Sequence, residues 1–467
     1  MKKLLNKISI LFIFSSFILA SCSKSFVERN PFGSVPTGDA ITDEASMQTA
    51  LNGAYAGLRS LGVYGRDWPV VGDLQADNTF IEVNNAGRYI EQYKYIFTET
   101  DEVYGEMWNA AYTVILRANK IIDANATGDN INALKAQAYA LRALMYFKLV
   151  NTYARPYTDD PSAPGVPLVL HYDPYVQPPR NTVAEVYAQI ISDYNTAFEN
   201  AVGYSNSVTL SKYAIEGLLA KAYLYMGDKV NAKKAAVDVI NNGEFSLVDA
   251  DNYHDFWKDP DIHIDAVEVM FEVDVDIIDN LGTDDLADMY AGGYTDLYAS
   301  DDLVNLYSPT DVRTSVLIPY ATKAGTPAVV VYKYQNSDNT KDRDNIKVIR
   351  LSEVYLIAAE ASLPNNEDDA RYYLNVIAET RDPDFSGYNS SGTELLNDIV
   401  TERRKELAFE GDRYYDLNRL KREIQRSDND GSITGPLTIP YDDYHRIAPI
   451  PQTETQANPN IEQNPEY

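Results

Sequence analysis

The sequence predicts a mostly α-helical protein, built as a scaffold of about four tetratricopeptide-like helix pairs with long loop insertions and minor β-hairpins. Apolar residues recur every three or four positions through most of the chain, which is the spacing of one helix face. Tight turns such as Gly227-Asp228 separate successive stripes, and alanines on the stripes let paired helices approach closely. With 467 residues, 45% of them hydrophobic, the chain can bury a large core.

The first 21 residues have the pattern of an export signal. Three lysines precede an apolar run over 8–19, which is too short to span a bilayer. The run ends in the sequence LASC, which resembles a bacterial lipoprotein cleavage site, and Cys22 is the only cysteine in the chain. We therefore expect residues 1–21 to be removed and Cys22 to be lipidated, with two or more acyl chains giving stable anchoring.

A tether is expected to follow the lipidated cysteine. Residues 23–43 are rich in Ser, Pro, Gly and Asn, a composition typical of extended linkers. The predicted organisation is therefore a signal peptide over 1–21, a lipid-anchored tether over 22–43, and a single helical domain over 44–467.

Paired helices are predicted by eight apolar stripes. Thr182 and Glu185 have the spacing of a capping box, and Ser211 is placed to cap another helix. Segments 214–240 and 351–377 each look like a tetratricopeptide unit, whereas the earlier pairs are irregular. The expected helices span 47–58, 108–122, 134–149, 182–198, 211–225, 232–240, 351–361 and 370–377.

Three long insertions without a helical pattern separate these helices, over about 62–104, 242–347 and 427–450. Short β-like pieces lie at 266–273 and 328–334 within the second insertion. Ordered loops of this length are usually functional, so a rigid scaffold that presents them is suited to binding.

The segment 402–420, ERRKELAFEGDRYYDLNRL, predicts two short helices joined at Gly411, because glycine tolerates the left-handed turn that ends many helices. Two interpretations are open. One is a solvated helix with surface ion pairs of ~0–1 kcal/mol each. The other is a partly buried ionic elbow that fixes how the two helices meet. Three pairs have a spacing that can meet across one turn: Arg403 with Glu406, Glu410 with Arg413, and Arg413 with Asp416.

This segment resembles the C-terminal signature of the SusD/RagB family of outer-membrane nutrient-uptake (starch-binding-like) lipoproteins. Four further stretches resemble the family in the expected order, so that the resemblance covers nearly the whole mature chain. They are WNAAYTVILRANKII at 108–122, AYALRALMYFKLVNTY at 138–153, IRLSEVYLIAAEA at 349–361 and IPQTETQANPNIEQNPEY at 450–467.

The resemblance implies a helical lipoprotein on the outer membrane and cell surface of a Bacteroidetes-type bacterium. Such proteins cap a SusC-like TonB-dependent transporter and bind oligosaccharides or, in some members, peptides. They use no cofactor and do no covalent chemistry. Family members often carry acids directly after the lipidated cysteine, but Ser23, Lys24 and Ser25 stand there in this chain. Surface exposure is therefore implied by the resemblance and not by this segment.

Net charge argues against nucleic acid as a partner. The chain carries a net charge of −29, and removal of the three signal lysines leaves 37 basic against 69 acidic residues, a net charge of −32. Such a surface repels phosphates and anionic lipid, and it favours neutral or cationic ligands. One cysteine and four histidines without ligand spacing also give no prediction of a metal site.

Sugar recognition requires an exposed aromatic ring flanked by planar polar side chains, which stack on the C–H faces and bond the hydroxyls. The first two insertions contain both residue types. For the rings the competing interpretation is ordinary packing, and for Asp77 and Asn78 it is a capping or turn role. The predicted ligand-binding residues are Tyr64, Arg66, Asp67, Trp68, Asp77, Asn78, Arg88 and Tyr89 in the first insertion, and Trp257, Tyr290 and Tyr294 in the second.

Two other functions are weighed against binding. A glycosidase needs two carboxylates at a set separation, which only a structure supplies, and no nucleophile elbow or phosphate loop stands in the sequence. A regular tetratricopeptide adaptor would not need long aromatic insertions or a lipid anchor. The sequence therefore favours an oligosaccharide-binding lipoprotein with no catalytic residues, with peptide binding as the alternative.

Overall fold

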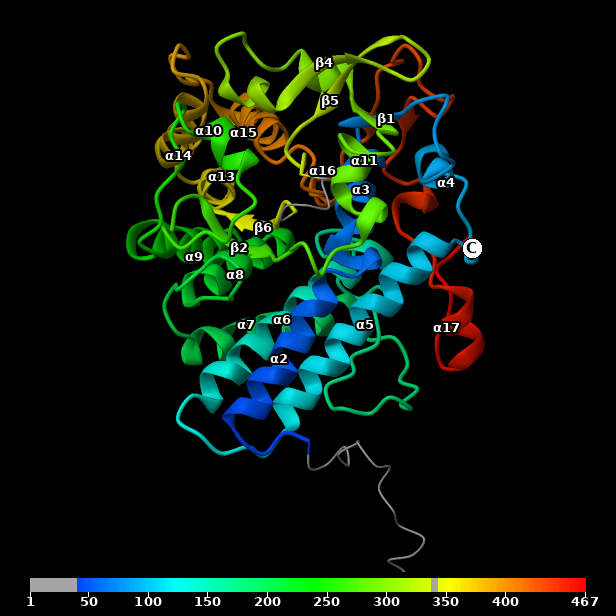
Figure 1. Ribbon diagram of the computed structural model, residues 1–467, viewed down its shortest axis with the longest axis vertical. Helices are drawn as coiled ribbons and strands as arrows, with labels where there is room; N and C mark the ends of the chain where they lie inside the picture. The colour runs from blue at the N-terminus through cyan, green and yellow to red at the C-terminus, as the bar shows by residue number, and fades with distance from the viewer. Residues whose placement is uncertain (1–39, 337–342) are drawn as a thin grey trace, which may run out of the picture.

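The computed structural model describes residues 40–336 and 343–467, and helices form most of it (Figure 1). The predicted signal peptide, Cys22 and nearly all of the tether lie outside the described residues. Every predicted helix is present. The long ones are α2 (Glu44–Leu58), α5 (Glu102–Asp123), α6 (Ile131–Tyr153), α7 (Val183–Asn200), α8 (Lys212–Met226), α9 (Lys229–Asn242), α13 (Leu351–Ser362), α14 (Glu367–Arg381) and α15 (Gly392–Glu406).

The helix starts follow the side chains that the sequence offers as caps. Thr182 and Glu185 form the predicted capping box at α7, and Ser211 accepts the backbone N–H of Ala214 at α8. Gly227 ends α8 in the left-handed region, with φ of 77°, and the chain returns as α9.

The helices stack in sequence order, as tetratricopeptide pairs do. Helices α2, α5, α6 and α7 pack side by side in the lower half of Figure 1, and α8 and α9 continue the stack. Helix α9 then packs against α13, although the second insertion separates them in sequence, and α13 packs against α14 and α15. Each pair therefore covers the apolar face of its neighbour.

The first insertion is not the non-helical excursion that the sequence predicted. It folds into a π-helical turn η4 (Leu61–Gly65), α3 (Asp67–Leu74), β1 (Thr79–Ile81) and α4 (Ile90–Lys94). All eight residues of α3 are buried, because they sit between the helix stack and the elbow. Helix α3 packs against the short helix α16 (Arg413–Arg419).

The second insertion contains short helices and strands. Strand β2 (Val269–Val273) pairs with β6 (Ile346–Arg350), and β1 pairs with β3 (Leu297–Ala299), which joins the first two insertions. Of the two predicted β pieces, only the second lies in a hairpin, formed by β4 (Leu317–Ala321) and β5 (Pro327–Val331). The other short elements here are α10 (Tyr253–Lys258), η5 (Gly282–Asp284), α11 (Leu286–Tyr290), α12 (Asp301–Val304) and η6 (Val312–Val316).

The C-terminal part wraps back over the scaffold. Its third insertion pairs β7 (Ile424–Gln425) with β8 (Thr438–Ile439), and η7 (Tyr444–Arg446) and α17 (Gln452–Ala457) follow. In Figure 1 this red segment lies beside α4 and α5, and its Gln452 bonds to Glu99 just before α5. Among the described residues, no helix combines the length and apolar composition that a membrane crossing requires.

The charged side chains of segment 402–420 are mostly buried, so the interpretation as an ionic elbow is confirmed and that of a solvated helix is wrong. Helix α15 ends at Glu406, Gly411 turns with φ of 82°, and α16 follows. The three predicted short-range pairs are wrong, because each side chain finds a distant partner. Arg403 pairs with Glu353 and Asp416, Glu410 with Lys333 and Arg350, and Arg413 with Asp77.

Glu406 is the centre of what we call the buried ion network: Glu268, Arg313, Arg350, Arg381, Glu402 and Glu406. Its carboxylate lies 2.9 Å from Arg350 and 3.0 Å from Arg381, and these side chains are fully buried. Burial alone would raise the pKa of Glu406, but Arg381, Arg350 and Arg313 outweigh it and hold that pKa well below its ordinary value. The network joins the scaffold helices α14 and α15 to β6 of the second insertion.

Candidate binding site

Five of the predicted binding residues meet where the first two insertions touch. We call the group the Arg88 cluster, and it consists of Arg66, Asp67, Arg88, Tyr89, Asp284 and Tyr294. Arg66 precedes α3, Arg88 and Tyr89 precede α4, and Asp284 ends η5. The residues from the first insertion lie about two hundred positions from those of the second in the sequence, as Arg88 does from Asp284.

The inner part of the cluster is buried and fully bonded. Arg66 Nε donates to Tyr89 Oη at 2.6 Å, and Tyr89 Oη donates to Asp67 Oδ1 at 2.5 Å. Tyr89 adopts the left-handed region with φ of 58° directly before α4. Burial raises the pKa of Asp67 to about 6, against the lowering effect of Arg66 and Tyr89. These three side chains therefore form a rigid base, not a ligand-facing surface.

The outer part of the cluster faces solvent. Arg88 stacks over the ring of Tyr294, with 3.8 Å from its guanidinium carbon to the ring centroid. Arg88 and Arg66 both pair with Oδ1 of Asp284, at 3.0 and 3.1 Å. The side chain of Asp284 is 50% exposed and that of Arg88 is 27% exposed. Within the described residues Oδ2 of Asp284 has no hydrogen-bond partner, so it is an available acceptor.

The cavity next to the cluster is small. It is lined in part by Gly65, Leu281 and Asp285, and its volume of about 20 Å³ holds one water. A ligand at the Arg88 cluster would therefore lie across the surface. Paired guanidinium and carboxylate groups next to an aromatic ring suit hydroxyl-bearing ligands.

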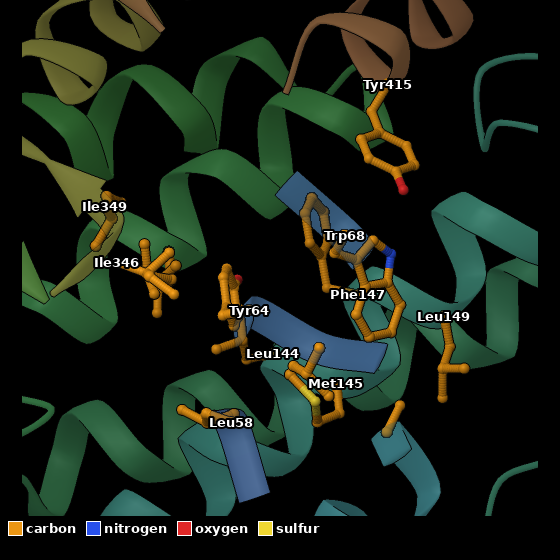
Figure 2. Close-up of a cluster of buried hydrophobic side chains, with 14 of the residues drawn as sticks. Leu58, Tyr64, Trp68, Leu144, Met145, Phe147, Leu149, Ile346, Ile349 and Tyr415 are labelled. Atoms are coloured by element: carbon orange, nitrogen blue, oxygen red, sulfur yellow. The ribbon is translucent and has the colours of Figure 1, made fainter. Parts of the chain in front are cut away.

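Trp68 and Tyr64 do not form an exposed platform, so this part of the prediction is wrong. Trp68 is 0% exposed, and its Nε1 donates to Thr152 Oγ1 at 3.0 Å. Figure 2 shows Trp68 and Tyr64 among side chains of α6, including Phe147 and Met145. The ring of Tyr64 also lies under Lys148. Both rings are core because α3 and η4 pack inward.

Trp257 and Tyr290 are likewise core residues. Trp257 is 0% exposed and lies beneath Lys333, whose Nζ is 4.5 Å from the ring centroid. Tyr290 is 0% exposed and meets Phe409 of the elbow edge-on at 5.7 Å. The exposed-platform prediction fails for these two rings because their short helices, α10 and α11, fold against the scaffold.

Asp77 and Asn78 have structural roles, but as partners of other buried side chains and not as the helix-capping or turn residues of the competing interpretation. Asp77 is paired with Arg413 at 2.8 Å, and Asn78 donates to Asp73 and accepts from Arg404. Neither side chain is directed at an available ligand surface. Together they fix the end of α3 to the elbow.

Asp284 was missed as a site residue. In the sequence it is one of many acidic residues and stands next to Asp285. Its pairing with Arg66 and Arg88 depends on long-range folding, for which a single sequence has no signal. Among the described residues no group of three or more His, Cys, Asp or Glu could hold a metal ion.

A helical-repeat scaffold that displays a polar, aromatic surface cluster between insertions defines a class of binding protein. Comparison with known proteins identifies that class. The model for the SusD family matches residues 320–467, and the model described as "Starch-binding associating with outer membrane" matches residues 32–224. The two matches lie at opposite ends of the chain.

Relatives match over nearly their whole length. A SusD superfamily protein of Bacteroides thetaiotaomicron is 30% identical, covers 90% of this chain and 99% of its own, and superimposes with a TM-score of 0.83. A Bacteroides vulgatus protein named as sugar binding is also 30% identical, with 92% and 99% coverage and a TM-score of 0.83. SusD-like protein P2 of Formosa agariphila is 28% identical over 99% of this chain and 100% of its own. The chain belongs to the SusD family.

Proposed function

We propose that this protein is a lipid-anchored outer-membrane receptor that binds an oligosaccharide at the Arg88 cluster and delivers it to a SusC-like TonB-dependent transporter. The observation that carries the proposal is the partly exposed Arg88–Tyr294 stack, with 3.8 Å between the guanidinium carbon and the ring centroid and with the half-exposed Asp284 beside it. One relative is named as sugar binding, and one matching family model is described as starch binding, which supports the same class of ligand.

The geometry explains how such a ligand would be held. Arg88 keeps N–H donors that Asp284 does not use, and Oδ2 of Asp284 can accept, so two adjacent sugar hydroxyls can bond both groups. Arg88 lies over one face of the partly exposed Tyr294 ring, so the C–H face of the sugar would contact the part of the ring that Arg88 leaves uncovered. Arg66 fixes Asp284 from below, so the polar array is set before the ligand arrives.

The binding test compares substitutions of Arg88 and Tyr294 with substitution of an exposed tyrosine elsewhere on the surface. A screen of immobilised glycans with the purified protein identifies the ligand, and calorimetry then measures its affinity. We expect Arg88→Ala and Tyr294→Ala each to weaken binding about tenfold or more. Tyr175→Ala is the control, because Tyr175 is 89% exposed on another loop. Equal affinities in all four proteins would overturn the proposed site.

The same screen tests the class of function. Saturable binding without product formation is the expected result. Release of shorter sugars from any glycan would instead identify an enzyme, and binding confined to peptides would select the alternative ligand.

The membrane part of the proposal has separate tests. Replacement of Cys22 by serine should abolish incorporation of labelled fatty acid and release the protein from the membrane fraction. Affinity purification of the lipidated protein from detergent-solubilised outer membranes should recover a TonB-dependent transporter. Recovery of the protein alone would contradict the transporter assignment.

A further inference from the structure

A second cavity lies between the loop that follows α6 and the C-terminal segment. Its volume is about 460 Å³, within the roughly 300–1,000 Å³ typical of small-molecule sites. We call it the tail pocket, and its lining includes Arg155, Pro164, Arg180, Tyr444, Ile447 and Glu462. No member of the Arg88 cluster lines it, so it is separate from the proposed oligosaccharide site.

Arg180 places a positive charge in the wall of the tail pocket. Its guanidinium donates to the carbonyl oxygens of Gly165 at 2.7 Å, Pro164 at 2.8 Å and Glu462 at 3.1 Å. Within the described residues it forms no ion pair with a carboxylate. Burial therefore lowers the pKa of Arg180 to about 10, since Tyr112 and Glu462 only partly offset the lost hydration. A bound anion would supply the missing counter-charge.

Arg155 provides the free donors. It donates one N–H, from Nη1 to the carbonyl oxygen of Tyr441 at 3.3 Å, and forms no ion pair in the part of the chain that the structure describes. The contrast with Arg142 is clear, because Arg142 is bidentate to Asp193 at 2.8 Å on both nitrogens. The guanidinium of Arg155 therefore has N–H donors available for a bidentate pair with a planar carboxylate.

The remaining lining suits a sugar ring. Pro164, Ile447 and the ring of Tyr444 give the pocket apolar walls, and Tyr444 is only partly buried. Two acids, Glu462 and Glu466, also line it, but both are exposed at the rim. Water and salt screen rim charges more strongly than the partly buried guanidinium of Arg180.

We propose that the tail pocket binds a sugar unit that carries a carboxylate, as in a uronic acid. The carboxylate pairs with Arg155 in front of the fixed charge of Arg180, and the pyranose ring lies against Tyr444. The pocket would thus accept an anionic group on a chain whose net charge is −29. Local donors decide this recognition, and the overall charge only slows the approach of the ligand.

Calorimetry with glucuronate and glucose tests the proposal on the purified protein. We expect glucuronate to bind at least about tenfold more tightly than glucose, and added salt to weaken it. Arg155→Gln should remove about tenfold of that affinity. Arg117→Gln is the matched control, because Arg117 also lacks an ion pair among the described residues and donates to the carbonyl of Gly53. Equal binding of the two sugars, or unchanged affinity in Arg155→Gln, would overturn the proposal.

Three variants keep the test independent of folding and of the Arg88 cluster. Arg155→Lys keeps the positive charge but loses the bidentate N–H donors of the guanidinium, so its affinity for glucuronate should be intermediate. Glu462→Gln removes a repelling rim charge while its carbonyl still holds Arg180, so it should bind glucuronate more tightly. Weaker binding in Glu462→Gln would count against the assigned orientation. A loss of glucuronate affinity in Arg88→Ala as large as that in Arg155→Gln would place the anion at the Arg88 cluster and overturn the proposal.

Discussion

Gly72 of α3 and Gly411 of the elbow cross without room for a side chain on either. A Cβ on Gly72 would lie 2.1 Å from the carbonyl oxygen of Gly411, and one on Gly411 would lie 2.6 Å from Cα of Pro69. The amide N–H of Gly411 also donates to Asp73 at 2.7 Å. The first insertion is thereby fixed to the C-terminal elbow through the backbone.

We expect Gly72→Ala to destabilise the protein by about 3 kcal/mol, because neither backbone can move aside and overpacking has this cost. Gly53→Ala is the control, since a Cβ there meets nothing within 4 Å on the helix α2. It should stabilise by about 0.5–1 kcal/mol through helix propensity. Urea unfolding of both variants measures the difference, and equal stabilities would refute the close crossing.

Loss of the central carboxylate of the buried ion network should be costly. In Glu406→Ala three guanidinium groups lose a shared partner at about 3 Å, so we expect a loss of about 3–5 kcal/mol. Asp368→Ala breaks the exposed pair with Arg371 and should change the free energy of unfolding by ~0–1 kcal/mol. Chemical denaturation compares the two variants. A small effect of Glu406→Ala would mean that the network reorganises around water.

The free energy of unfolding should fall as pH rises from about 5 to 8. Burial raises the pKa of Asp73 to about 7 and that of Asp67 to about 6, so the folded state holds protons that the unfolded chain has released at these pH values. Stability from both groups is therefore lost as pH rises through their folded pKa values. Thermal unfolding across this range measures the effect, and Asp73→Asn should flatten it. A stability that increases steadily toward pH 8 would contradict this account.

Acid should destabilise the protein through the buried carboxyl groups whose pKa is lowered. Arg403 and Arg419 outweigh burial and lower the pKa of Asp416, and the guanidinium groups of the buried ion network do the same for Glu406. Their contribution is complete above the unfolded pKa, near 4, and is lost as pH falls below it. Unfolding followed by circular dichroism between pH 5 and pH 2 tests this, and added salt should have little effect on such buried pairs.

Trp68→Ala should act on stability and not on recognition. Its ring is fully buried and bonded to Thr152, so truncation should cost about 3–5 kcal/mol. Ligand affinity of the folded fraction should stay unchanged, in contrast with Tyr294→Ala. Calorimetry below the unfolding temperature separates the loss of stability from a loss of ligand affinity. Weaker ligand binding by folded Trp68→Ala would show that Trp68 contributes to the binding site.

The helices could be predicted because their signals are local. The stripes, the Thr182–Glu185 capping box and the Gly227 turn each depend on residues within a few positions, and all are confirmed. The resemblance to the SusD family was carried by such segments too. The buried ionic elbow was one of two open interpretations, and its burial could be decided only by what packs around it.

The site was harder to predict because exposure is a long-range property. Trp68 looks like a sugar-binding ring beside Arg66 and Asp67, but its partner Thr152 lies 84 positions away on α6. Likewise, Arg403 and Glu406 have the right spacing to pair, but each finds stronger partners on other elements. The sequence named the residues of the Arg88 cluster except Asp284, the carboxylate that brings its two halves together.

Arg66 contacts Asp67 at the start of α3 as well as Asp284 of the second insertion. The Gly72–Gly411 crossing and the base of the Arg88 cluster thus share one short helix, and a sugar bound to the folded protein would raise its melting temperature. Evolution of new ligand preference in such an arrangement should proceed by exchange of the two outermost side chains, while the bonded layer below them stays constant.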